Sequence, residues 1–169
     1  MNKLGPNIDR FRRSESGLAL VELAMAIPLM FLFFAITVEG GRLFWSYQAM
    51  IQGVRDASRY AGRVVPSDLC SAGGSVSSYI STTDLRALIE RNANTHSIFP
   101  PLIALTGVGV TSRCVGTPGQ YRVSPAPVLE VEATLQVQFP FSGFARIFTG
   151  TPLATVTTTV SDESRVFGS

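Results

Sequence analysis

A single carboxylate inside a long apolar run has the clearest chemical meaning of any residue in this sequence. From Leu18 to Val38 the chain reads LALVELAMAIPLMFLFFAITV, in which Glu22 is the only charged residue. A carboxylate costs about 2.5–3.5 kcal/mol at the centre of a membrane helix, and less near its end. Since an anchor alone would be more stable with leucine there, we expect Glu22 to have a function. The other interpretation, a glutamate that reaches interfacial water and has no role, stays open.

Outside this run, the residues capable of chemistry do not combine into a recognisable site. His96 is the only histidine, which excludes a metal site with several histidines, and no GxSxG motif accompanies it. A phosphate-binding loop follows a strand and opens a helix, and Gly107 and Gly109 do neither. Glu130 and Glu132 share one face of an alternating segment, which is typical of a solvated sheet surface. We therefore predict no catalytic residue, no metal and no cofactor.

The two cysteines, Cys70 and Cys114, both follow the apolar run. An even number of cysteines in an exported, oxidising environment favours a disulfide between them. Closing a loop of that length would contribute about 4 kcal/mol in the chain-entropy model. Neither cysteine belongs to a CxxC motif, so the sequence does not indicate redox catalysis. Two unpaired, buried cysteines are the alternative.

The charge distribution predicts one membrane span with an exported remainder. The net charge is +2 and only 15% of the residues are charged, so we expect no nucleic-acid partner. As a helix, the apolar run can cross the roughly 30 Å of hydrocarbon in a bilayer. A cleaved secretory signal is an alternative, since Ala24–Ala26 has the small-x-small form, but it would leave an exposed apolar segment on the product. Basic residues before the run predict a cytoplasmic N-terminus, although Arg42 weakens the asymmetry; they are Lys3, Arg10, Arg12 and Arg13.

The helical pattern continues beyond the membrane span. Pro28 should kink the span, because a proline inside a helix removes one backbone hydrogen bond. Arg55, Arg59 and Arg63 stand four residues apart, and we interpret them as a solvated face, with contact to an acidic subunit or to lipid headgroups as alternatives. Over residues 39–65, apolar residues recur at helical spacing and need a partner surface; they are Leu43, Tyr47, Met50, Ile51, Val54, Ala57, Ala61 and Val64.

The segment after Pro66 predicts a loop and a second, shorter helix. Residues 66–80 are rich in glycine and serine and carry Cys70. Ser81, Thr82 and Thr83 are good helix caps, so we expect a helix to start there and to end near Asn92–Asn94. Its buried side should consist of Leu85, Leu88 and Ile89.

The last third of the chain changes to the two-residue period of strands. Residues 128–139 alternate strictly between an apolar and a polar face, and weaker strands are expected at about 107–115 and 153–166. Three strands so close in sequence predict an antiparallel meander, covered on its apolar face by the amphipathic helix. The fold class is thus α+β, with one long helix and one short helix against a small sheet. The aromatic connector at 140–148 either caps the core or forms an exposed docking patch.

Over Gly17–Arg42 the chain resembles the TadE-like family of minor pilins, or pseudopilins, of tight-adherence (Tad/Flp, type IVb-like) pilus systems. The resemblance is carried by Gly-Leu-Ala-Leu-Val-Glu-Leu-Ala from Gly17, then Pro28, an aromatic-rich apolar run and Glu39-Gly40-Gly41-Arg42. Beyond Arg42 it rests on layout, a long helix followed by a small β-rich domain. One departure is Leu23, because major pilins of this system usually have Tyr or Phe after the glutamate. This difference points to a minor component.

The resemblance implies that a membrane-embedded prepilin peptidase cuts between Gly17 and Leu18. A glycine before the cut allows the backbone to lie extended in a tight protease cleft. The cut creates an ammonium group at Leu18, and Glu22 of a neighbouring subunit can pair with it inside a low-dielectric helix bundle. Such a pair would fix the register of neighbours more than it adds stability.

We therefore expect a non-enzymatic, single-pass protein of the bacterial inner membrane that contributes to pilus assembly, initiation or tip structure. The expected segments are a cleaved cytoplasmic leader (1–17), the transmembrane helix (18–38), its amphipathic extension (39–65) and a periplasmic domain (66–169). The resemblance implies the prepilin peptidase, other minor pilins, the major pilin, the inner-membrane assembly platform and membrane lipid as partners, with incorporation in the pilus left open. Alternatives are an uncleaved, signal-anchored periplasmic binding module and a membrane-tethered hydrolase that uses His96 with a serine.

Overall fold

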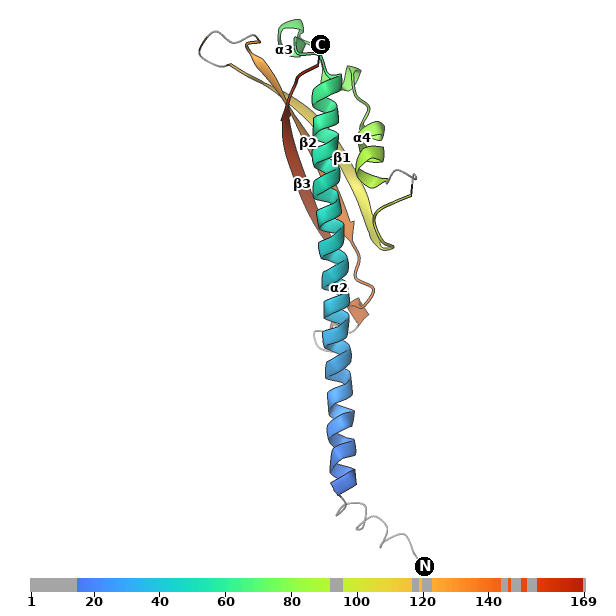
Figure 1. The fold of residues 1–169 in the computed structure, drawn as a ribbon. Helices are drawn as coiled ribbons and strands as arrows, with labels where there is room; N and C mark the ends of the chain where they lie inside the picture. Colours follow the sequence, from blue (N-terminus) through green and yellow to red (C-terminus); the bar gives the residue numbers. More distant parts are fainter. Residues whose placement is uncertain are drawn as a thin grey trace, which may run out of the picture. The chain divides into compact units, whose positions relative to one another are not determined.

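The structure, a computed structural model, describes residues 15–91, 96–116, 119, 123–143, 146, 150–151 and 155–168 (Figure 1). The chain divides into two compact units, Met1–Gly40 and Gly41–Ser169. Helix α2, Glu15–Val64, contributes to both of them. Most of the predicted leader, residues 1–14, lies outside the described residues.

In the first unit, α2 is an apolar helix whose side chains are almost all exposed. It begins at Glu15, three residues before the expected start at Leu18, and it continues through Pro28 without a break. Within the described residues, α2 alone is long and apolar enough to cross a membrane. Exposed apolar side chains surround it on all sides, including Leu18, Leu20, Leu23, Met25, Leu29, Met30, Phe33 and Phe34. A helix that is apolar all round needs lipid or other helices as its surroundings.

The second unit is built on the predicted antiparallel meander. Its strands are β1 (Ile103–Val115), β2 (Ala126–Val137) and β3 (Val156–Arg165), in the order β1-β2-β3. The register places Val131 of β2 opposite Val110 of β1 and Asp162 of β3. The α+β prediction is confirmed, although β1 begins four residues earlier than expected, at Ile103 rather than Gly107.

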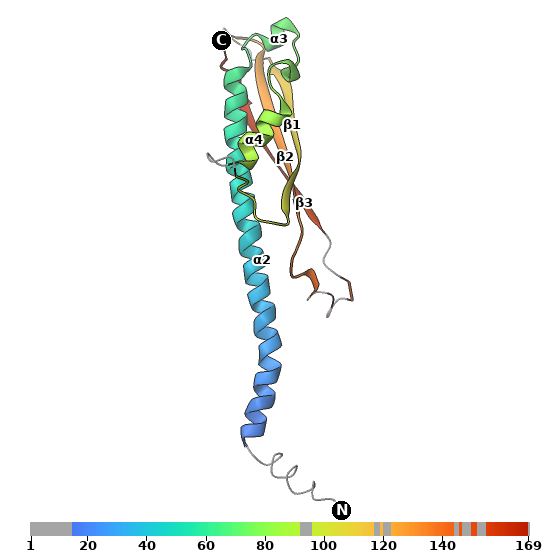
Figure 2. The same cartoon turned by 90° about the vertical axis from the view of Figure 1, so that its right-hand side faces the viewer.

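The core of this unit lies between the C-terminal half of α2 and the sheet, which run side by side in Figures 1 and 2. Strand β2 buries alternate residues, and its other face carries Glu130 and Glu132. Two residues predicted for the buried side of α2 are instead exposed, Tyr47 at 37% and Val64 at 41%. The core consists mainly of Met50, Val54, Ala57, Ala61 and Val65 from and after α2, together with Leu129, Val131, Ala133, Leu135 and Val137 from β2.

The buried side of α2 is lined by small and polar residues as well as apolar ones. Ser46 and Ser58 are fully buried, and Gly53 and Gly62 are buried too. A Cβ added at Gly53 would lie 2.9 Å from the Cα of Ile89, so the helix backbone touches its neighbour there. Hydrophobicity alone could not identify this side of the helix, because close backbone contact selects small residues rather than large apolar ones.

The neighbour at Gly53 is α4, Thr82–Glu90, which is the predicted short helix. The Ser81 hydroxyl accepts a hydrogen bond from the Thr83 N–H and caps the N-terminus as expected. Leu85 and Ile89 are buried, but Leu88 is 42% exposed and does not belong to the buried side. A nine-residue helix that contacts the core along one line buries positions four apart, and Leu88 lies beside that line. The helix ends at Glu90, before the expected Asn92–Asn94, which lie outside the described residues.

Two short helical turns and a disulfide close the end of the domain where α2 finishes. They are α3 (Leu69–Ala72) and η1 (Val76–Ser78). Cys70 in α3 and Cys114 in β1 form the disulfide that the sequence favours, with their Cα atoms 5.9 Å apart. The bond ties the segment after α2 to the far end of the sheet.

Candidate functional site

The predicted processing site lies in the first turns of α2. Residues 15–18 are already helical, whereas the sequence suggested that the helix starts after the cut. Glycine is a weak helix former, so the helix is locally less stable at Gly17 than at its apolar neighbours.

Glu22 lies one helical turn after Leu18 and is exposed in the first unit. Among the described residues it has no hydrogen bond or ion pair. Residues four apart lie on one face of a helix, about 6 Å apart along the axis, and helical side chains lean toward the N-terminus. The Glu22 carboxylate and an amino group at Leu18 would thus lie at nearly the same depth in a membrane. This is the placement that a charge pair between neighbouring helices requires.

Further along the same unit, an apolar hollow of about 360 Å³ opens between Ile27, Met30, Phe31 and Phe34. These residues follow the helical spacing of one face. Almost no polar surface lines the hollow, so it suits a side chain from another membrane helix. The hollow begins about one and a half turns after Glu22 and extends to Phe34, past the middle of the span.

In the second unit, Arg55, Arg59 and Arg63 are all exposed on α2. None of them forms an ion pair with another described residue. On an adjacent side of the helix, the buried Ser58 hydroxyl lies 2.5 Å from Asp162 Oδ2 of β3 and donates a hydrogen bond to it. This contact orients α2 against the edge of the sheet, so the three arginines face away from the domain.

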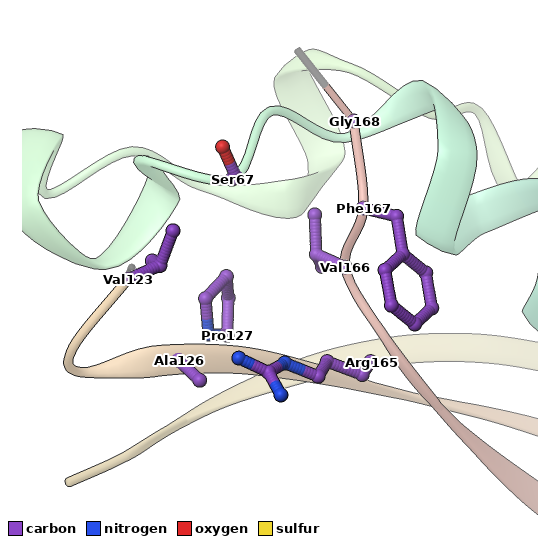
Figure 3. Close-up of a pocket in the computed structure, with 8 residues that line it drawn as sticks. All are labelled: Ser67, Val123, Ala126, Pro127, Arg165, Val166, Phe167 and Gly168. Atoms are coloured by element: carbon purple, nitrogen blue, oxygen red, sulfur yellow. The ribbon is translucent and has the colours of Figure 1, made fainter. Parts of the chain in front are cut away.

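A second hollow, of about 460 Å³, lies at the end of the domain near the C-terminus (Figure 3). Its wall is nearly as polar as it is apolar, and Arg165 and Ser67 supply its polar side chains. Phe167 stands at its side with 74% of its surface exposed. The sequence analysis did not identify this hollow, because its lining comes from three separate segments: Ser67; Val123, Ala126 and Pro127; and Arg165, Val166, Phe167 and Gly168.

The residues considered for catalysis do not gather into one place. Glu130 and Glu132 lie on the sheet face opposite the core, as the solvated-face interpretation expects, and Arg113 pairs with Glu163 on that same face. His96 is exposed. Across the described part of the chain, no group of three or more His, Cys, Asp or Glu side chains is arranged to hold a metal ion.

A helix long and apolar enough to cross a membrane, which continues into the core of a small α+β domain, is consistent with the class of membrane-anchored, pilin-like proteins. Residues 17–59 match the model of the family described as TadE-like protein. The similarity to this family is confined to that segment; the TadE-like family is generally non-enzymatic and is involved with the Tad pilus machinery. No curated protein and no solved structure matches the chain.

Proposed function

We propose that the protein is a minor pilin of a tight-adherence pilus, processed by prepilin peptidase and active in assembly, initiation or tip structure. It acts without catalysis, anchored by one span in the inner membrane, with the domain from Gly41 onward on the periplasmic side. The observation that carries the proposal is the Gly17–Glu22 spacing at the start of a spanning helix, inside the segment that matches the family. The apolar hollow at Ile27–Phe34 supports packing of that helix against other pilin helices.

In this proposal, Glu22 pairs with the ammonium group that cleavage creates at Leu18 of a neighbour. Before assembly, each charge lies near the membrane surface, where water still reaches it. After assembly, the surrounding helices exclude water, and either charge alone would be strongly disfavoured. Subunits staggered by one turn would leave both charges unpaired. The pair therefore selects one stagger between neighbours.

N-terminal sequencing of protein extracted from membranes tests the proposal. In cells that contain the peptidase, the mature chain should begin at Leu18. Gly17→Leu should keep Met1 and block assembly, because a bulky side chain does not fit the cleft that glycine enters. Gly40→Leu is the matched control: Gly40 is also a helical glycine, and a Cβ there meets nothing within 4 Å. An unprocessed Met1 terminus on the wild-type protein would overturn the proposal.

A second candidate function is an uncleaved, signal-anchored binding module. The hollow beside Arg165 and Phe167 favours it, because one cation in a wall of mixed polar and apolar surface suits a small anionic ligand. The same variant separates the two functions. Under the binding-module hypothesis, Gly17→Leu leaves every property of the protein unchanged.

A further inference from the structure

Leu102 has an unusual backbone conformation for an exposed leucine. Its φ is 69°, in the left-handed region that residues with a Cβ rarely adopt, and its side chain is 49% exposed. Two hydrogen bonds hold the conformation: the Ile103 N–H donates to the Pro100 carbonyl, and the Gln138 N–H donates to the Leu102 carbonyl. The fold thus holds an apolar side chain outward at a position where the backbone is strained. Strain of this kind points to a function for the residue.

The turn that carries Leu102 is hydrogen-bonded to α2 near the start of the second unit. The Arg42 guanidinium donates a hydrogen bond to the Pro101 carbonyl, 2.5 Å away. Beside this contact, Trp45 and Arg42 of α2 face Ile98 and Pro100 across a hollow of about 430 Å³. Trp45 is 70% exposed, and Phe44 next to it is 66% exposed. Exposed aromatic side chains therefore occur on the helix, and an exposed aliphatic side chain occurs on the turn.

The position of Arg42 in the chain limits how far this surface can be from the membrane. Arg42 follows Val38, the last residue of the apolar run, by four residues. Four residues span about 6 Å as a helix and at most about 14 Å fully extended. The headgroup layer on each side of the hydrocarbon is roughly 5–8 Å thick. Arg42 and the turn bonded to it therefore belong at or beside that layer.

We propose that the turn at 99–102, together with Phe44 and Trp45, docks the exported domain on the phospholipid headgroup layer of the bilayer that α2 spans. This inference rests on the proposed function, because it requires α2 to span the bilayer. Leu102 and the two aromatic residues enter the layer between headgroups and acyl chains, where tryptophan and apolar side chains are favoured. Arg42 holds the turn beside the helix. The contact would be lost when the subunit leaves the bilayer, so docking is a property of the subunit before it is extracted.

Tryptophan fluorescence tests the docking, because Trp45 is the only tryptophan in the chain. The full chain with Trp45→Phe is inserted into vesicles of phosphatidylethanolamine and phosphatidylglycerol, with a new tryptophan introduced by Leu102→Trp. The matched control carries Phe167→Trp, since Phe167 is exposed at the other end of the domain, where its N–H donates to the Gly62 carbonyl. Lipids brominated near the headgroup end of the acyl chains, and acrylamide in the water, serve as the two quenchers.

We expect the brominated lipids to quench the tryptophan at position 102 at least twofold, and the tryptophan at 167 hardly at all. Acrylamide should show the reverse order. Equal behaviour at the two positions overturns the docking, and so does shielding of position 102 from both quenchers, which would mean that a protein covers the turn. Leu102→Gly removes the backbone strain and the apolar side chain together, so the variant should still fold. Because it should no longer dock, backbone hydrogen exchange of residues 98–103 in vesicles should be faster than in the wild type. Unchanged exchange also counts against the docking.

Alkaline carbonate extraction of the same vesicles separates this inference from the proposed function. If the chain is released, the helix does not span the bilayer, and both proposals fail. If the chain stays in the membrane while the tryptophan at position 102 remains in water, only the docking of the turn fails.

Discussion

At the scale of single residues, Gly53 is a position where α2 lies directly against the backbone of α4. Gly53→Ala would add a Cβ 2.9 Å from the Cα and 3.0 Å from the carbonyl oxygen of Ile89. Those are backbone atoms of α4, so the two helices must separate. We expect overpacking to lower the free energy of unfolding by about 1–3 kcal/mol. The better helix propensity of alanine should offset up to about 1 kcal/mol of this loss. Thermal unfolding of the full chain in detergent, followed by circular dichroism, measures the net loss.

Gly41→Ala is the matched control for this prediction. Gly41 lies in the same helix and the same unit, but a Cβ there meets nothing within 4 Å. Only the gain in helix propensity remains, so the variant should be as stable as the wild type or up to about 1 kcal/mol more stable. If both variants behaved alike, the close contact with α4 would not exist.

Ser58 is the second residue with a specific structural role, because its hydroxyl lies within hydrogen-bond distance of both Asp162 Oδ2 and the Arg55 carbonyl of its own helix. It is fully buried, and its hydroxyl reaches Asp162 Oδ2 at 2.5 Å. Ser58→Ala leaves a half-buried carboxylate without this donor, so we expect a loss of about 1–3 kcal/mol in unfolding free energy. Ser46→Ala is the control, because Ser46 is equally buried but bonds only the Arg42 carbonyl of its own helix, 2.9 Å away. Denaturant titration should show that Ser46→Ala changes the unfolding free energy by no more than about 0.5 kcal/mol.

These residues also show the limit of prediction from sequence at this scale. Met50, Val54, Ala57 and Ala61 were predicted for the buried side of α2 because they are apolar and correctly spaced, and they are buried. Ser58 and Gly53 were missed, because a hydroxyl satisfied by a distant carboxylate and a glycine against a backbone leave no signal in hydropathy. Their partners, Asp162 and Ile89, lie far along the chain and are brought close only by the fold.

At the scale of elements, the disulfide is expected to provide a large part of the domain's stability. Cys70 and Cys114 are separated by 44 residues. Removing that cross-link with Cys114→Ser should lower the unfolding free energy by about 4 kcal/mol in the chain-entropy model. Chemical denaturation of the wild type with and without reductant, beside the variant, measures the change. If reductant lowers the denaturation midpoint of the wild type but not that of Cys114→Ser, the loss of stability is due to this disulfide. Equal midpoints for the oxidised wild type and the variant would contradict the prediction.

The arginines on α2 allow a prediction about the helix surface. Like charges four residues apart destabilise a helix by about 0.2–0.5 kcal/mol per pair, and Arg59 belongs to two such pairs, with Arg55 and Arg63. Since the three side chains are exposed, we expect Arg59→Gln to stabilise the isolated protein by a few tenths of a kcal/mol and to leave its association with other pilus subunits unchanged. Affinity co-purification tests this, and a loss of partners would show that an acidic subunit uses the arginines.

The strands show why boundaries were predicted less well than element types. Strand β2 alternates strictly, and its prediction differs from the structure by two residues at each end. In β1 the register shifts between Leu105 and Gly107, so the buried positions change from 103 and 105 to 108 and 110. A bulge of this kind breaks the two-residue period. The alternation read from Gly107 onward therefore could not be extended back to Ile103.

At the scale of the whole molecule, evidence for function is concentrated in the N-terminal third. The family match covers residues 17–59, which include the proposed processing site and most of α2. The sheet lies outside that match, and its features at the C-terminal end, such as the hollow beside Phe167, arise from segments distant in sequence. One continuous segment was thus enough to predict the long apolar helix, and the processing site within it stays a prediction. The surfaces of the domain required the fold.

Glu22→Gln tests the proposed role of the anchor in assembly without touching the cleaved bond. The amide has nearly the same size as the carboxylate and can still accept a hydrogen bond, but it cannot neutralise an ammonium group. Cleavage after Gly17 should therefore proceed, and N-terminal sequencing should give Leu18. Incorporation should fall at least tenfold, because the ammonium of each neighbour would remain unpaired in a dry helix bundle, and a tenfold change corresponds to only about 1.4 kcal/mol. Glu22→Asp, which keeps the charge on a shorter side chain, should recover part of the incorporation. Normal co-purification of Glu22→Gln with other pilus subunits would show that the charge is not used in packing, even if the processing site is correct.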